Sequence, residues 1–256
     1  MQKLTCGVGF LVISAVNISW AQGPGIIDPV RSVSVQTHLC TLNAGKTMAD
    51  LNDAQQGWRA AVEAGAYNGL SLQLTPRYVS GPTLDVIWLD YLPYDQLAQS
   101  SEWWDDNAQD FTAAILEVVS CRVSLNTNNL RYFNDAIPED GTGFFLWDWC
   151  TRLDGVTNAA VAARQDEFFQ GLSEAGPRGA WSLMFPYFGM RAEDRLGEFA
   201  HTIMLPDWTA LTAVHENWAM GGWRGRVAFE DNFAQCTGLN VYDLTVTNRP
   251  HTPWVE

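Results

Sequence analysis

Basic residues are scarce in this chain of 256 residues, which has 15 lysines and arginines against 29 aspartates and glutamates. The formal net charge is therefore −14, with histidines counted as neutral. A field of that sign repels phosphate backbones and anionic lipids, so nucleic acids are not expected partners. The hydrophobic fraction of 47% is ordinary for a globular protein and excludes wholesale disorder.

Several catalytic and metal-binding signatures are also missing. The chain has no G-x-S-x-G, phosphate-loop, H-E-x-x-H or EF-hand pattern. It also lacks the C-x-x-C spacing that indicates a zinc cluster. No metal site is predicted, and candidate functional residues must be inferred from their place in the expected fold.

The longest apolar run lies at the N-terminus. Residues 1–21 contain Lys3, a mostly apolar stretch from Cys6 to Val16, and small residues at Ser19 and Ala21. This layout predicts a secretory signal peptide, because the run is too short to span a bilayer. An uncleaved anchor or an N-terminal core helix is the alternative. We expect a periplasmic or secreted protein without a membrane-inserted segment after signal removal.

The rest of the chain contains an internal repeat. Cys40-Thr41 is followed by Gly45 and Thr47, and Cys150-Thr151 is followed at the same offsets by Gly155 and Thr157. Further matches follow in the same order: Glu63-Ala64-Gly65 with Glu174-Ala175-Gly176, Ser71-Leu72 with Ser182-Leu183, Leu92-Pro93 with Leu205-Pro206, and an L-x4-E-x-W that ends at Trp104 and Trp218. Each copy ends at a second cysteine, so the chain is predicted to consist of two similar halves.

Both copies predict the element order βαββαβ, which is the ferredoxin-like unit. In the first copy the expected elements span residues 32–39, 47–65, 70–79, 85–91, 96–119 and 122–126. In the second they span 144–150, 157–176, 181–189, 198–204, 208–235 and 239–247. The predicted organisation is unit 1 at 22–126, a linker at 127–142, unit 2 at 143–250 and a tail at 251–256.

The cysteines fit this order of elements. Without Cys6, four cysteines remain in an oxidising compartment, where disulfides are favoured, and four allow three connectivities. The first and last strands of a βαββαβ sheet are antiparallel neighbours, so the end of one lies beside the start of the other. This predicts two structural disulfides, one in each unit: Cys40–Cys121 and Cys150–Cys236.

Two such units in one chain resemble the dimeric α/β-barrel superfamily. Its members include cofactor-independent monooxygenases, haem-degrading oxygenases, chlorite dismutase-like and dye-decolourising peroxidases, and small stress-response proteins. The likeness covers nearly the whole mature chain, but it rests on element order and on the repeat, and the G-x-x-D-G of the peroxidases is absent. The resemblance implies an α+β fold in which two tandem ferredoxin-like units form an intramolecular pseudo-dimer around a cavity between their sheets.

Strand alternation suggests which residues line that cavity. Val33, Val35 and Leu39 form an apolar face that we expect to cover helices, whereas Gln36 and His38 point towards the other sheet. The expected ligand-binding residues are Gln36, Gln73, Trp88, Asp90, Arg122, Trp149 and Met184. Such a cavity fits a small apolar or aromatic molecule. The alternative is that the two sheets pack together and the polar groups form hydrogen bonds across the interface.

Three further residues are catalytic candidates. His38 and His201 stand on strands expected to line the cavity, where each is a candidate general base, and Asp148 aligns with His38 through the shared Cys-Thr. A His38–Asp148 pair across the pseudo-dyad would tune such a base. The repeated Glu102 and Glu216 are interpreted as structural.

The resemblance also suggests haem binding as an alternative function. Haem-degrading oxygenases of the superfamily bind iron through a histidine on the corresponding helix with a tryptophan nearby, which maps onto His215 and Trp208. The asparagine that they require on the first strand is not matched, and a surface histidine is the alternative. We therefore expect a small-molecule-binding protein, with a haem-dependent or cofactor-free oxidoreductase, or a structural protein with a filled cavity, as alternatives.

Overall fold

The computed structural model describes residues 32–58, 67–80, 84–136, 138, 140–170, 176–189 and 196–250. The predicted signal peptide at 1–21 and the tail at 251–256 lie outside the described residues. Within the described part, no helix has the length and apolar character needed to cross a membrane.

The first half contains the elements that the repeat predicts. Its strands are β1 (Ser32–Leu42), β2 (Leu70–Tyr78), β3 (Val86–Leu92) and β4 (Val119–Asn134). Its helices are α1 (Met48–Ala54), α3 (Tyr94–Asn107) and α4 (Gln109–Val118). Helix α1 begins where the sequence predicts, because the Thr47 side chain accepts from the Asp50 amide and Asp50 bonds back to the Thr47 backbone in a capping box.

The second half repeats this order with a more divided last region. Its strands are β5 (Thr142–Arg152), β6 (Gly179–Phe188), β7 (Phe199–Leu205), β8 (Ala234–Cys236) and β9 (Asn240–Asn248). Its helices are α5 (Asn158–Gln170), α6 (Trp208–Asn217), a π-helical turn η2 (Trp218–Gly222) and α7 (Trp223–Asn232). Gly221 has φ +117 within η2, so the Gly221-Gly222 step divides the helix expected at 208–235.

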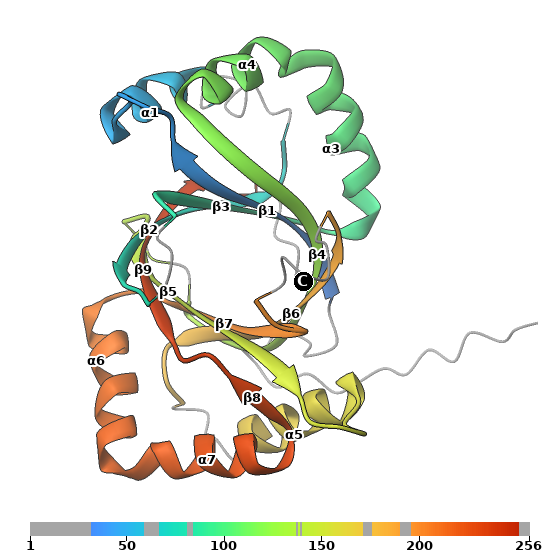
Figure 1. The fold of residues 1–256 in the computed structure, drawn as a ribbon, viewed down its shortest axis with the longest axis vertical. Helices are drawn as coiled ribbons and strands as arrows, with labels where there is room; N and C mark the ends of the chain where they lie inside the picture. Colours follow the sequence, from blue (N-terminus) through green and yellow to red (C-terminus); the bar gives the residue numbers. More distant parts are fainter. Residues whose placement is uncertain are drawn as a thin grey trace, which may run out of the picture.

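Eight strands close into an antiparallel barrel in the order β4-β1-β3-β2-β9-β5-β7-β6 (Figure 1). The pairings β2–β9 and β4–β6 join the two halves of the ring. Helices α1, α3 and α4 cover one side of the barrel, and α5, α6 and α7 cover the other. The short strand β8 is not part of the ring. It pairs with the last residues of β5, beyond the part of β5 that pairs with β9.

Apolar side chains fill the barrel. One buried cluster draws residues from strands all around the ring, so it must occupy the interior: Val35, Leu72, Leu74, Leu89, Phe145, Trp147, Trp149, Met184, Ala200 and Leu244 are members. Separate clusters lie between the outer face of the strands and the helices of each half. The space between the two sheets is therefore a packed core.

Both predicted disulfides are confirmed. Cys40 pairs with Cys121 across β1 and β4, and Cys150 pairs with Cys236 across β5 and β8. In each case the two cysteines are direct neighbours in the strand register, because the first strand ends where the last strand begins. Each bridge closes a long loop, with sequence separations of 81 and 86 residues.

Two elements differ from the sequence prediction. Residues 127–134 were expected in a linker but continue β4, which pairs with β1 through its first part and with β6 through its second. Asn126 and Asn128 of this strand are buried, and the Asn126 amide donates to Thr37 Oγ1 over 2.8 Å. The helix expected at 96–119 is two helices, which meet at Ala108.

Candidate functional site

The polar face of the first half points towards the helices, so the expected orientation was wrong. Val35 belongs to the barrel interior, whereas His38 lines a cavity together with residues of α3 and α4. Alternation correctly separates the two faces of β1, but it does not say which face meets the other sheet. Here the more apolar face of β1 points into the barrel interior. That interior is surrounded by strands on every side and is shielded from water.

This outer face carries a cavity of about 320 Å³ between the sheet and the helices. Ligand pockets begin at about this size. Five of the residues predicted from sequence meet on the strands below it, since His38 pairs with Trp88, Gln36 with Asp90, and Gln73 with Trp88 in the strand register. Smaller hollows continue from it along α3 and share Gln36 with it.

The floor of the cavity is a hydrogen-bonded polar group. Ser71 Oγ donates to Asp90 Oδ1 over 2.5 Å, and Asp90 Oδ2 lies 3.5 Å from His38 Nε2. The Gln36 amide nitrogen is 2.9 Å from the same His38 nitrogen. Gln36 and Asp90 therefore both lie within reach of the same ring nitrogen of His38.

Tyr67 lies close behind this floor. Its hydroxyl is buried, and burial followed by the negative charge of Asp90 raises the pKa of Tyr67 well above its usual value. The phenol is therefore neutral and keeps its proton beside the carboxylate. Among the described residues, Asp90 is the one acidic side chain of this floor, and the Ser71 hydroxyl donates to it.

The walls of the cavity come from side chains that the sequence analysis did not identify. Trp58, Trp104 and Phe111 form an aromatic group with ring centroids 5.2–5.8 Å apart. Gln55 lies beneath them, only 5% exposed, and its amide donates to Gln73 Oε1 over 2.8 Å. Gln55 stands at the position of Gln165 in the repeat, which is the one sequence signal that could have found it.

Three predicted ligand-binding residues lie elsewhere. Trp149 and Met184 are buried in the barrel interior, 4% and 1% exposed, and contribute to its packing. Arg122 pairs with Leu39 in the register, whereas its neighbour Val123 pairs with His38 and lines the cavity. Arg122 therefore points to the opposite face of β4 from the cavity.

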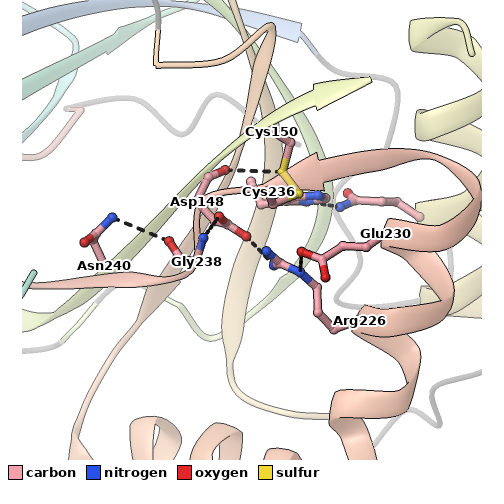
Figure 2. A network of polar contacts seen from close by, with 9 residues as sticks. Asp148, Cys150, Arg226, Glu230, Cys236, Gly238 and Asn240 are labelled. Carbon is pink, nitrogen blue, oxygen red and sulfur yellow. Dashed lines mark hydrogen bonds and ion pairs between the residues drawn. A yellow bond between two sulfur atoms is a disulfide. The ribbon is translucent and has the colours of Figure 1, made fainter. Parts of the chain in front are cut away.

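The matching place in the second half is filled by the protein itself. Asp148 is completely buried, and it accepts hydrogen bonds from the Arg226 guanidinium and, over 2.9 Å, from the Gly238 amide (Figure 2). Arg226 also binds Glu230 over 2.7 Å. Burial raises the pKa of Asp148 while Arg226 opposes the rise. The expected His38–Asp148 pair is not formed, because the two side chains face helices on opposite sides of the barrel.

His201 pairs with Asp148 in the strand register and has its own partners. Its Nδ1 is hydrogen-bonded to the amide of Gln165, and its ring packs against Phe199 and Phe229. Burial and the nearby Arg226 lower the pKa of His201 to about 3. The ring also lies near Cys150 and Cys236, but these sulfurs form a disulfide and offer no thiolate to a metal.

The haem candidates face solvent. His215 is exposed in the last turn of α6, and Trp208, at the start of that helix, is 54% exposed and packs on Phe144. Neither residue lines the cavity described above. The described residues of α6 therefore do not form an enclosed haem site around His215.

Comparisons with known proteins support the fold. No family model matches the sequence, and no curated protein matches it. A candidate monooxygenase from Fusobacterium nucleatum subsp. nucleatum has a similar structure, with a TM-score of 0.58, 12% identity, and coverage of 89% of this chain and 98% of that one. The chain has a dimeric α/β-barrel fold.

Two more structures share this dimeric α/β-barrel fold. A candidate monooxygenase from Lactobacillus acidophilus gives a TM-score of 0.52 at 10% identity, covering 88% of this chain and 99% of that one. A mutant chlorite dismutase from Candidatus Nitrospira defluvii gives 0.50 at 8% identity, covering 84% and 92%. At these identities the comparisons establish the fold of the α/β barrel and leave its chemistry to the residues.

Proposed function

We propose that the protein binds a small molecule with an apolar or aromatic body in the cavity between the first-half sheet and α3 and α4. The observation that carries this proposal is the cavity itself, which has aromatic walls of Trp58, Trp104 and Phe111 above the polar floor of His38 and Asp90. A mostly apolar pocket with a few convergent polar groups is the usual form of a small-molecule site.

The proposal also covers the internal architecture of the protein and its cellular compartment. The strand orders β4-β1-β3-β2 and β9-β5-β7-β6 are the same order in two halves, which supports two ferredoxin-like units in an intramolecular pseudo-dimer. The two disulfides support a periplasmic or secreted location, because such bonds persist in oxidising compartments.

A cavity-filling substitution tests the binding site. Ile115 lines the cavity from α4, whereas Ala113 is exposed on the same helix. We expect ligand-observed NMR with a panel of small aromatic molecules to detect saturable binding to the wild type and to Ala113→Trp, and none to Ile115→Trp. Equal binding by all three proteins would place the site elsewhere and refute the proposal.

A second candidate function is a cofactor-free oxidoreductase with His38 as the general base. It is favoured by the position of His38 in the cavity floor, where its Nε2 lies 3.5 Å from Asp90 Oδ2, which would stabilise the ring once it takes a proton. The structural neighbours described as candidate monooxygenases agree with this reading. Oxygen uptake that is lost in His38→Ala, with ligand binding retained, would support it over simple binding.

The haem alternative is less compatible with the residues present. Haem carries propionate carboxylates, and the described residues that line the cavity include Asp90 but no lysine or arginine to pair with them. A haem titration followed by visible absorption tests this directly. We expect no saturable Soret band, and a one-to-one band that disappears in His215→Ala would restore the haem reading.

A further inference from the structure

The charge of the cavity narrows the class of ligand beyond its size and apolar character. Among the described residues that line it, Asp90 is the one acidic side chain, and no lysine or arginine is present. Asp90 Oδ1 is held by Ser71, while its side chain remains 25% exposed. One carboxylate oxygen is therefore positioned by the protein, and the group stays accessible from the cavity.

The aromatic walls suit the same type of ligand. Trp58, Trp88 and Trp104 line the cavity together with Phe111. Indole faces attract cations through their quadrupole, and tryptophan does so most strongly among the aromatic side chains. A carboxylate below several indoles is thus a favourable environment for a positive charge on an apolar body.

The second half shows this chemistry within the chain itself. Arg226 and Phe111 each stand ten residues before the second cysteine of their half, on the helix that covers the sheet. In the second half this position supplies a guanidinium that binds the buried carboxylate of Asp148 (Figure 2). In the first half it supplies an aromatic ring, and no lysine or arginine is among the described residues that line the cavity with Asp90.

Resting on the proposed binding function, we infer that the ligand of the first-half cavity is an organic cation, an amine or quaternary ammonium group on an apolar or aromatic body. The cation lies against Asp90 and between the indole rings, where Arg226 supplies the positive charge in the other half. The net charge of −14 also raises the concentration of cations near the protein.

Probes of the same shape and different charge test this inference. Phenyltrimethylammonium and tert-butylbenzene are close isosteres, and phenylacetate supplies the anionic comparison. In ligand-observed NMR with the full disulfide-bonded protein, we expect the cation to bind about tenfold or more tightly than the neutral isostere, since one desolvated charge contact is worth that much. Phenylacetate should not bind measurably.

Matched variants identify the carboxylate. Asp90→Asn removes the charge with little change in shape and should abolish the preference for the cation. Glu117→Gln removes the same charge from an exposed position on α4 outside the cavity, and it should retain the preference. Thermal unfolding of both variants checks that they are folded. The comparison of the three probes on the wild type does not depend on either variant.

The possible outcomes separate the two proposals. If tert-butylbenzene or phenylacetate binds to the wild type as tightly as the cation, the binding site stands and the inference about charge is wrong. If none of the probes binds to the wild type, the binding function itself fails and the inference fails with it. A cation preference that survives Asp90→Asn would also overturn the assignment of the charge to this carboxylate.

Discussion

His38 and Asp148 occupy the same place in the two halves of the barrel, two residues before the first cysteine, yet their surroundings differ completely. The His38 ring borders a cavity and contacts Gln36 and Asp90. The Asp148 carboxylate has no exposed surface and binds Arg226 and the Gly238 amide. The barrel therefore has a cavity beside His38, whereas a side chain of the protein itself fills the corresponding place beside Asp148.

Removing the cation that binds Asp148 should be costly. Arg226→Met leaves the buried Asp148 without its charge partner, and we expect the free energy of unfolding to fall by about 3–5 kcal/mol. Urea unfolding measures this. Arg164→Met is the control, because its pair with Glu167 is exposed and should be worth less than about 1 kcal/mol. Equal losses in the two variants would contradict the importance of the buried pair.

Adding Asp148→Asn to Arg226→Met gives a second check. This double variant has no unpaired buried charge, so it should recover part of the stability lost in Arg226→Met alone. A double variant that is less stable than the single one would mean that Arg226 acts through packing rather than through charge.

His201 should make stability depend on acid pH. Its folded-state pKa of about 3 lies below the ordinary value of 6.5, so between these pH values the unfolded chain binds a proton that the folded protein does not. This contribution is present above about pH 6.5 and is lost as the pH falls towards 3, by about 1.4 kcal/mol per pH unit at most. In His201→Gln the slope of unfolding free energy against pH should be shallower by that amount, and an unchanged slope would show that His201 is protonated in the folded state.

The two glycines around the break in the second half should respond in opposite ways to alanine. Gly221 has φ +117, where a Cβ is strained, so Gly221→Ala should lower the unfolding free energy by about 1–2 kcal/mol. Gly225 is exposed within α7 with open space around its Cα, so Gly225→Ala should raise it by up to about 1 kcal/mol. Thermal unfolding of the two variants tests both signs at once, and a stabilised Gly221→Ala would refute the strained turn.

Each disulfide should contribute similarly to stability. The two loops are nearly equal in length, so replacing Cys40 and Cys121 by alanine should cost about as much as replacing Cys150 and Cys236, about 2–5 kcal/mol in each case. Urea unfolding under oxidising conditions measures the two losses, and the same experiment with a thiol reductant should remove the difference from the wild type. A pair whose removal changes nothing would contradict a structural role for that bridge.

The sequence predicts the repeat, the strands and both disulfides because these depend on local patterns and on strand adjacency. It does not predict which face of β1 lies inside the barrel, since Val35 and His38 alternate in the same way in either orientation. That choice depends on closure of the ring by β2–β9 and β4–β6, which is a property of both halves together. The aromatic walls of Trp58 and Trp104 were missed for a related reason: the helix pattern does not show which strand residues a helix will cover.

Strand β4 pairs with strands of both halves of the barrel. Its first residues pair with β1 in the first half, and its last residues, through Asn134, pair with β6 in the second half. A second-half fragment that begins at residue 143 would lack residues 127–134 and leave β6 with an unpaired edge, which is the type of surface at which chains aggregate. We therefore expect the barrel as a whole to be the shortest fragment that folds alone.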